Sequence, residues 1–144
     1  MKSISSILKG KSSISEFVYA GNSLFTLLNT KTGSRFTYRF KKGRRDNVWC
    51  VSVLTSPANF SYIGVSIFDE NKKEYVYIHA KKSKVTLKAQ SALTINWFIS
   101  ALNHDSIPEN VEVWHNGRCG KCGRALTVPE SIEVGLGPTC RGTV

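Results

Sequence analysis

The stretch 35-RFTYRFK-41 decides the fold class of this chain, because its side chains alternate strictly between two kinds. One set is cationic or hydroxyl-bearing and comprises Arg35, Thr37, Arg39 and Lys41. The other set is aromatic and comprises Phe36, Tyr38 and Phe40. Successive side chains of a β-strand point to opposite faces of the sheet. The alternation therefore predicts a strand with one aromatic face and one basic, solvated face.

Four further runs outside this stretch have the apolar and β-branched character of strands. They are Leu24–Thr30, Val48–Leu54, Phe60–Phe68 and Tyr75–His79. Turn-forming segments separate them, among them 31-KTGS-34, which has the length of a hairpin turn, and 56-SPAN-59. Gly64, inside the third run, is a candidate for a bulge or for a close approach of another strand. Consecutive strands joined by such short turns predict an antiparallel β-meander.

The stretch 91-SALTINWFISALN-103 changes the period from two to that of a helix. Its apolar residues at helical spacing are Leu93, Trp97, Phe98, Ala101 and Leu102. Ser91 is a candidate for the N-cap. Residues 14–106 are therefore expected to form a basic α+β domain, an antiparallel β-meander with one packed helix. Residues 1–13, rich in Ser and Lys, are expected to be a flexible basic arm.

Composition bounds the class of protein. The chain has 144 residues, of which 41% are hydrophobic and 10% aromatic, which is enough to bury a core. It has no apolar run near the roughly 20 residues that span a bilayer, and its start lacks the apolar core of a secretory signal. We therefore expect a cytoplasmic protein, with no membrane partner, in a reducing compartment. Clustered cysteines in such a compartment favour metal binding over disulfides.

The net charge of +10 is unevenly distributed along the chain. Residues 1–101 hold sixteen of the twenty Lys and Arg but only five of the ten Asp and Glu. Residues 102–144 are close to neutral, yet they hold three of the four cysteines. This asymmetry indicates two parts with different roles.

The last third carries the spacing His115-x3-Cys119-x2-Cys122-x17-Cys140. Two cysteines two residues apart in a glycine-bearing turn can direct both thiolates at one ion, and structural zinc sites are closed by four Cys or His ligands. Residues 107–144 are therefore predicted to form a small zinc-knuckle or ribbon-like module that binds one structural Zn²⁺. His115, at the end of a short predicted strand, is the preferred fourth ligand. The alternatives are Cys50, His104 or a water molecule.

A catalytic zinc would keep an open position and need a general acid or base. Glu130 and Glu133 are the nearest carboxylates in sequence, and they are better explained as the exposed start of a short helix. The His-x-Glu pattern of zinc deaminases is absent, since Asn116 and Gly117 follow His115. The zinc is therefore expected to be structural.

The stretch 117-GRCGKCGRALTVPESIEVGLGPTC-140 resembles the ending of an uncharacterised family of small bacteriophage and prophage proteins. That ending has the pattern GRCxxCGRxLTxPxSIxxGxGPxC, and every fixed element of it is present here. The upstream segments KTGSRFTYRF and WCVSVLTSPANFSYIGVSIF resemble the family more loosely. The resemblance implies a mobile-element origin and a metal-bound C-terminal module, and it implies no activity.

Two clusters of cations mark a candidate surface for nucleic acid, because a row of cations attracts the phosphate backbone. The candidate contacts are Arg35, Arg39, Lys41, Lys42, Arg44, Arg45, Lys81, Lys82 and Lys84. Tyr62 could stack on a base if it shares the basic face, whereas the alternation places Phe36 and Tyr38 on the core face.

A non-enzymatic, zinc-stabilised nucleic-acid-binding protein of phage type is the function that these features favour, with DNA or RNA left open. The alternative is an inhibitor of a host defence system, anti-CRISPR or anti-restriction, that contacts a host ribonucleoprotein or its guide RNA. An enzyme is not favoured, because no phosphate-binding loop, nucleophile elbow or acidic metal pair appears. His104 and Asp105 form the one local acid–base pair, and they follow the predicted helix in a loop.

Overall fold

The chain forms one seven-stranded sheet and two helices in the computed structural model, which describes residues 6–57, 59–115, 117–123 and 136. In chain order the elements are β1 (Ser6–Leu8), α1 (Lys11–Val18), β2 (Asn22–Asn29), β3 (Arg35–Lys42), β4 (Val48–Ser56), β5 (Asn59–Asp69), β6 (Glu74–His79), α2 (Gln90–Asn103) and β7 (Val111–His115).

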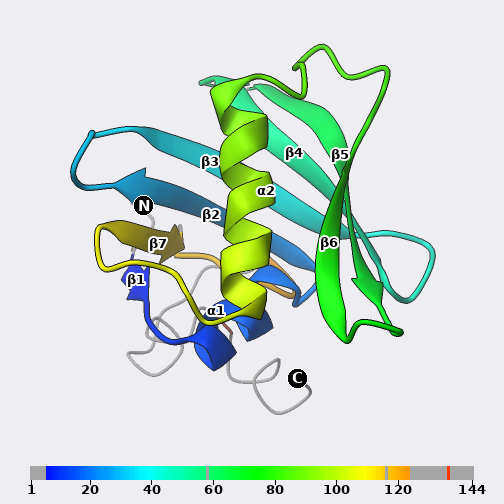
Figure 1. The fold of residues 1–144 in the computed structure, drawn as a ribbon, viewed down its shortest axis with the longest axis horizontal. Helices are drawn as coiled ribbons and strands as arrows, with labels where there is room; N and C mark the ends of the chain where they lie inside the picture. Colours follow the sequence, from blue (N-terminus) through cyan, green and yellow to red (C-terminus); the bar gives the residue numbers. More distant parts are fainter. Residues whose placement is uncertain (1–5, 58, 116, 124–135, 137–144) are drawn as a thin grey trace.

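The strands pair in the order β1-β7-β2-β3-β4-β5-β6, and every pair is antiparallel. Strands β2 to β6 follow one another in space as they do in sequence, so the predicted meander is confirmed (Figure 1). The central strand β3 is the alternating stretch, with Tyr38 and Phe40 fully buried as expected.

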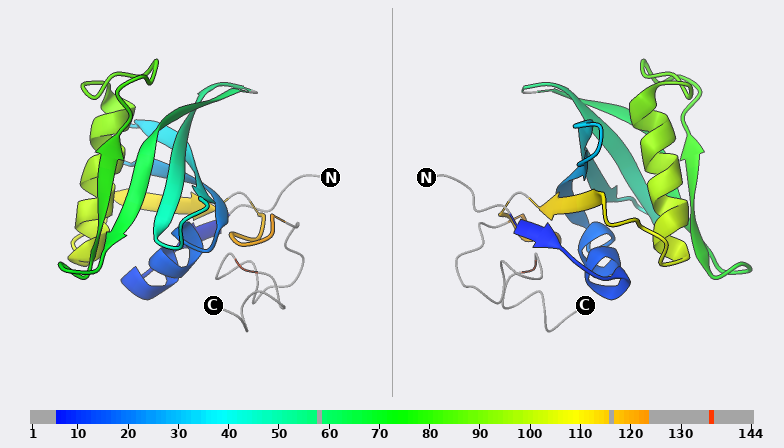
Figure 2. Two further views of the ribbon diagram at one scale, coloured as in Figure 1. Left: turned by 90° about the vertical axis from the view of Figure 1, so that its right-hand side faces the viewer. Right: turned by 60° about the vertical axis from the view of Figure 1, so that its left-hand side comes forward.

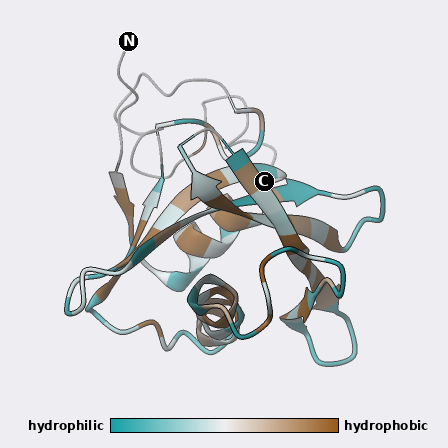
Figure 3. Ribbon diagram, turned by 90° about the horizontal axis from the view of Figure 1, so that it is seen from above, coloured by the Kyte–Doolittle hydropathy of each residue, from teal (hydrophilic) through white to brown (hydrophobic). Residues whose placement is uncertain are grey.

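The sheet is strongly curved, and α2 lies in its concave side (Figure 2). Figure 3 looks along the axis of α2 and shows the strands curving around the helix. Phe98 of α2 packs on the ring of Phe25 of β2, at 5.9 Å between ring centroids, and both side chains are fully buried. The α+β class predicted from the sequence is therefore confirmed. Among the described residues, no helix is long and apolar enough to cross a membrane.

The flexible arm expected at residues 1–13 is wrong for the part that the structure describes. Ser6–Leu8 forms β1 on the outer edge of the sheet, where Ile7 pairs with Trp114 of β7. Lys11 begins α1, which buries Ile14, Phe17 and Val18. Two interactions order this Ser-rich segment. The apolar face of α1 packs into the core, and β1 pairs with β7.

The boundary expected between residues 106 and 107 falls just before a strand of the main sheet. The strand expected to open the C-terminal module, β7, lies inside the main sheet, paired on one side with β2 and on the other with β1. The backbone N–H of Asn22, at the start of β2, also donates to the carbonyl oxygen of Gly120 at 2.7 Å. The segment that follows β7 is thus attached directly to the sheet.

The predicted helix at residues 91–103 is confirmed, but its cap and its buried face differ from the expectation. It begins at Gln90 after Ala89, and no side chain caps it. Leu93 and Trp97 are 48% and 41% exposed, because the concave sheet contacts a face centred on Ile95 and Phe98. Two large apolar side chains are therefore left on the outer side of α2.

Tyrosine burial predicts a loss of stability at alkaline pH. Burial raises the pKa of the Tyr19, Tyr38 and Tyr77 phenols well above the ordinary value of about 10. Their phenols ionise first in the unfolded chain, so the stabilisation is complete below about pH 10 and declines as the pH rises above it. We expect the free energy of unfolding to fall progressively above that pH in urea titrations.

The variant Tyr38→Phe serves as the control for this effect. It removes one buried phenol, whose hydroxyl donates to the carbonyl oxygen of Ser91 at 2.7 Å. Its stability should therefore fall less steeply with pH than that of the parent protein. Equal slopes for both proteins above pH 10 would contradict the assignment of the effect to buried phenols.

Candidate nucleic-acid interface

The convex side of the sheet, called here the open face, carries the polar half of the alternating stretch. Residues directly opposite each other on antiparallel strands share a face. Arg39 of β3 lies opposite Ser52 of β4, and Ser52 lies opposite Tyr62 of β5. Leu54 of β4 lies opposite Phe60 of β5 in the same way. The open face therefore combines cations from β3 with aromatic side chains from β5.

Arg39 and Phe60 form the centre of this surface. The guanidinium carbon of Arg39 lies 4.3 Å from the centroid of the Phe60 ring, a cation–π geometry. The contact holds the guanidinium over the Phe60 ring. A planar cation held in this way can stack on a base or bind a phosphate while losing little further side-chain entropy.

Tyr62 connects this centre to the second basic cluster, which consists of Lys81, Lys82 and Lys84. Its side chain is 49% exposed, and it lies with Phe60, Lys82 and Lys84 around a hollow of about 310 Å³. Partial burial first, and the neighbouring Cys50 sulfur second, raise the pKa of the Tyr62 phenol. The phenol therefore stays neutral at neutral pH and adds no negative charge to the basic surface.

The loop that carries the second cluster is fixed to the sheet by two hydrogen bonds. The Ser83 hydroxyl donates to the carbonyl oxygen of Tyr62 at 2.9 Å. The Nε2 atom of His79 donates to the carbonyl oxygen of Val85 at 2.8 Å. Lys82 and Lys84 are both exposed, and they are thereby held beside Tyr62.

No carboxylate of the described residues forms an ion pair with a cation of the open face. Within the described parts of the chain, the one ion-pair contact joins His104, which directly follows α2, and Glu74 of β6. Arg39 and Lys41 make no such contact there. A group of unpaired cations produces a positive potential that attracts polyanions.

The structure brings together some of the predicted contacts and separates others. Arg35, Arg39 and Lys41 share the open face, since they alternate along β3. Lys42 lies on the opposite side, with its amine 5.0 Å from the ring of Trp49. The remaining predicted cations are exposed in two connecting segments, namely Arg44 and Arg45 between β3 and β4, and Lys81, Lys82 and Lys84 between β6 and α2.

Phe60 was not among the residues selected from the sequence. Its position on the basic face depends on the register between β4 and β5, which shifts between Val51 and Ser52. The sequence does carry one signal for it, the pattern 60-FSY-62 beside a turn. Residues two apart in a strand point to the same face, so the pattern predicts that Phe60 and Tyr62 share a face.

The predicted metal ligands lie partly within the described residues. Cys119 is fully buried and Cys122 is exposed, and Cys140 lies outside the described residues. The N–H of Lys121 donates to the sulfur of Cys119 at 3.4 Å, and the N–H of Gly123 donates to the Cys119 carbonyl oxygen at 2.9 Å. Among the described residues, no three His, Cys, Asp or Glu side chains are grouped closely enough to hold a metal.

His115 has a hydrogen-bonded role that bears on the choice of fourth ligand. Its side chain is fully buried, and its ring lies 5.7 Å from the ring of Phe17. The N–H of Gly117 donates to its Nδ1 atom at 2.9 Å. Coordination of a metal through Nε2 would place the ring proton on Nδ1, and the bond from Gly117 would then be lost. His115 as a zinc ligand stays a prediction that requires this local rearrangement.

Comparison with known proteins identifies one part of the chain. No curated protein matches it, and no solved structure does. Residues 113–144, from within β7 through the cysteine turn to the end, match the model of a family of unknown function, DUF6011. The C-terminal part of this protein is thus of the kind found in an uncharacterised family.

Proposed function

We propose that this protein is a non-enzymatic binder of single-stranded nucleic acid, and that the open face of its sheet is the binding surface. One observation carries the proposal: Arg39 stacks on Phe60 on the same face as the exposed Tyr62. Surfaces that bind single strands without sequence preference combine cations that follow the backbone with aromatic rings on which bases stack. Lys82 and Lys84, beside Tyr62, extend the cationic path to the end of the sheet.

A structural zinc ion belongs to this proposal. The thiolates of Cys119, Cys122 and Cys140, with His115 or another fourth ligand, would bind one Zn²⁺ per chain. The short turn around Cys119 supports this, because its backbone already donates to the sulfur. The ion would hold the segment after β7 against α1 and β2.

Phage or prophage origin and action in the cytoplasm of the bacterial host are also part of the proposal, and they rest on the sequence pattern at residues 117–140. Inhibition of a host defence complex is a related function, since a guide RNA would present the same ligand to the open face. Recovery of a host nuclease subunit with the purified protein would favour the inhibitor. Recovery of nucleic acid alone would favour the simpler binding function.

The salt dependence of binding tests the proposal. Affinity for a single-stranded oligonucleotide should fall steeply between about 50 and about 200 mM salt, because each neutralised phosphate releases counterions. Anisotropy titrations with labelled DNA and RNA of one sequence, and with the matching duplexes, would measure the slope and the preferred form. Absence of binding to every ligand at the lower salt concentration would refute the proposal.

Removing the central cation should weaken binding more than removing a remote one. We expect Arg39→Ala to reduce affinity about tenfold and to lower the salt slope by about one unit. Lys9→Ala is the matched control, because Lys9 is an exposed cation after β1, on the far edge of the sheet. Equal effects of the two substitutions would mean that net charge alone drives binding.

Removing the exposed ring of Tyr62 should also weaken binding. Stacking of one base on an aromatic side chain contributes about 1–3 kcal/mol, so Tyr62→Ala should reduce affinity by about tenfold. Tyr62→Phe keeps the ring and should bind as the parent protein does. Loss of affinity in both variants would point to the hydroxyl group and contradict stacking.

A further inference from the structure

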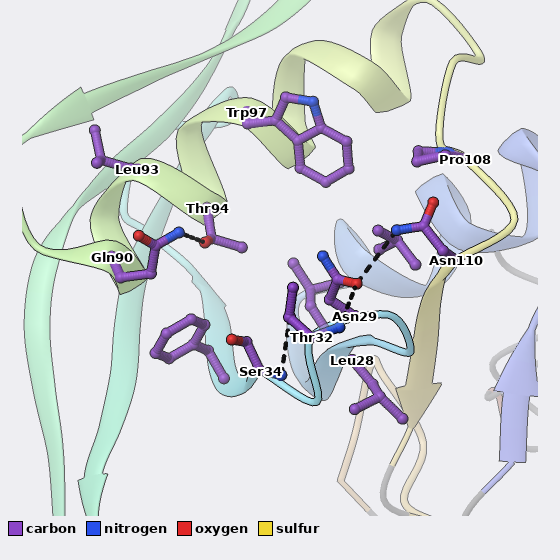
Figure 4. A pocket seen from close by; sticks show the side chains of 13 residues that line it. Leu28, Asn29, Thr32, Ser34, Gln90, Leu93, Thr94, Trp97, Pro108 and Asn110 are labelled. Atoms are coloured by element: carbon purple, nitrogen blue, oxygen red, sulfur yellow. Dashed lines mark hydrogen bonds between the residues drawn. The ribbon is translucent and has the colours of Figure 1, made fainter.

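A second hollow lies on the other side of the molecule, between the outer side of α2, the β2–β3 hairpin and the start of β7. Its volume is about 600 Å³, within the range of ligand sites. Trp97 and Leu93, the two apolar residues that the sheet leaves exposed, form one wall (Figure 4). Asn29 and Asn110 lie across from them (Figure 4). All of the residues that line it are uncharged.

Two asparagine side chains in this groove are held in fixed orientations. The Oδ1 atom of Asn29 accepts the N–H groups of Lys31 at 3.0 Å and Thr32 at 3.3 Å, and the Nδ2 group of Asn110 at 3.3 Å. Only an oxygen can accept from three donors, so these bonds determine which end of the Asn29 amide faces outward. The carbonyl oxygen of Asn110 accepts in turn from the backbone N–H of Thr30 at 2.7 Å.

This arrangement leaves the amide nitrogen of Asn29 as a donor and the amide oxygen of Asn110 as an acceptor for a ligand. The Nδ2 group of Asn29 and the Oδ1 atom of Asn110 have no hydrogen-bond partner among the described residues; the former is directed towards Trp97 and the latter towards Pro108 (Figure 4). The groove therefore combines an exposed indole ring with a pre-oriented donor and acceptor.

The residues next to the groove indicate a ligand attached to a polyanion. Lys31 and Arg35 are exposed and adjoin lining residues in sequence, against one exposed carboxylate, that of Glu109. The lining itself is neutral, so the charged part of the ligand would lie outside the groove and a neutral planar part inside it. A nucleotide of a single strand is divided in this way, with a neutral base and an anionic phosphate.

We propose that this groove binds one unpaired nucleobase, stacked on Trp97 and hydrogen-bonded through its edge to Asn29 and Asn110. Each of the natural bases has an adjacent donor and acceptor on its edge, so the groove accepts bases broadly and requires only that the base be unpaired. The inference rests on the proposed function for the strand as a whole, but no residue proposed to bind the strand at the open face lines the groove, so the two can be tested separately.

Neutral nucleosides separate base recognition from charge. We expect uridine to shift the NMR resonances of the Trp97 indole N–H and the Asn29 side-chain amide in the full chain. N3-methyluridine, which has lost the edge donor, should bind about tenfold more weakly. An acetylated dipeptide amide should leave both resonances unmoved, and a shift as large as that with uridine would overturn the inference in favour of a peptide groove.

Two variants with matched partners complete the test. Trp97→Leu should abolish the uridine shift at Asn29, whereas Trp97→Phe should retain it; both are tolerable because the side chain of Trp97 lies on the surface, 41% exposed. Asn29→Asp keeps the oxygen that accepts from Lys31 and Thr32 but removes the donor, and it should weaken uridine about tenfold.

The outcomes distinguish this inference from the proposed function. Salt-dependent binding of oligonucleotides that leaves the Trp97 and Asn29 resonances unmoved would overturn the nucleobase groove and leave the open face intact. Binding of uridine with no binding of oligonucleotides would support the groove and refute the proposed function.

Discussion

Purified protein is expected to contain about one zinc ion per chain, and Cys122→Ser is expected to lose it. Cys122 is the informative ligand to replace, because its side chain is exposed whereas Cys119 is fully buried. Replacing the buried cysteine would disturb the packing around it as well as the metal. A loss of zinc in Cys122→Ser would therefore report on coordination alone. Binding of structural zinc contributes roughly 10 kcal/mol in small modules, so a large fall in thermal stability should accompany the loss.

Cys50→Ser is the matched control for this prediction. Cys50 lies on β4, opposite Lys41 of β3 and Val65 of β5, and β3 separates it from Asn22 of β2, which bonds to Gly120 in the turn between the other two described cysteines. It should keep the full zinc content, measured by atomic emission on the same preparation. Loss of zinc in Cys50→Ser would make this residue the fourth ligand in place of His115. Absence of zinc from the parent protein would refute the metal site altogether.

The strands of the meander were predictable because their signal is local. In β3 the alternation of cations and aromatic rings follows from the two-residue period of a strand, and every aromatic residue of that set faces the core side. Gly64, identified in sequence as a bulge or a close approach, lies beside the register shift between β4 and β5. Short turns then leave little choice of pairing, since consecutive antiparallel strands become neighbours.

The edge of the sheet was not predictable, because its strands pair across the length of the chain. β1 is three residues long and is stabilised by β7, more than a hundred positions away. Neither strand carries a local sign of its partner. The expectation of a flexible arm and a separate C-terminal module followed from considering each segment alone, whereas the pairing of β1 with β7 places the described strand of each segment in one sheet.

The centre of the candidate interface needed three-dimensional information for the same reason. The basic residues of β3 are evident in sequence, but the contact between Arg39 and Phe60 depends on the register of β4 against both neighbours. The apolar pattern of α2 is broader than the face that the concave sheet can cover. The two apolar side chains that the sheet does not cover, Leu93 and Trp97, therefore line the groove. This depends on the curvature of the sheet, which the helical periodicity of the sequence does not reveal.

Gly64→Val is expected to lower the free energy of unfolding by about 3 kcal/mol, or the melting temperature by roughly 10 °C for a chain of this length. A Cβ atom at Gly64 would overlap the carbonyl oxygen of Ile78 on the neighbouring strand β6, and it would lie 3.0 Å from the ring and hydroxyl of Tyr77. The first of these is backbone, so β6 itself must move. That strand is bonded to α2, because Asn103 accepts from the Tyr75 N–H at 2.9 Å and donates to its carbonyl oxygen at 2.7 Å.

Two companion substitutions make the result specific to this contact. Gly64→Ala places the same Cβ atom with no further branches, so its loss of stability should lie between those of the parent and the valine variant. Tyr62→Val introduces valine on the same strand, where the native side chain is half exposed, and should change stability by no more than about 0.5 kcal/mol. Thermal melts followed by circular dichroism give all three values. A valine variant as stable as the parent would mean that β5 and β6 do not approach so closely at Gly64, and the packing of β6 between β5 and α2 would have to be revised.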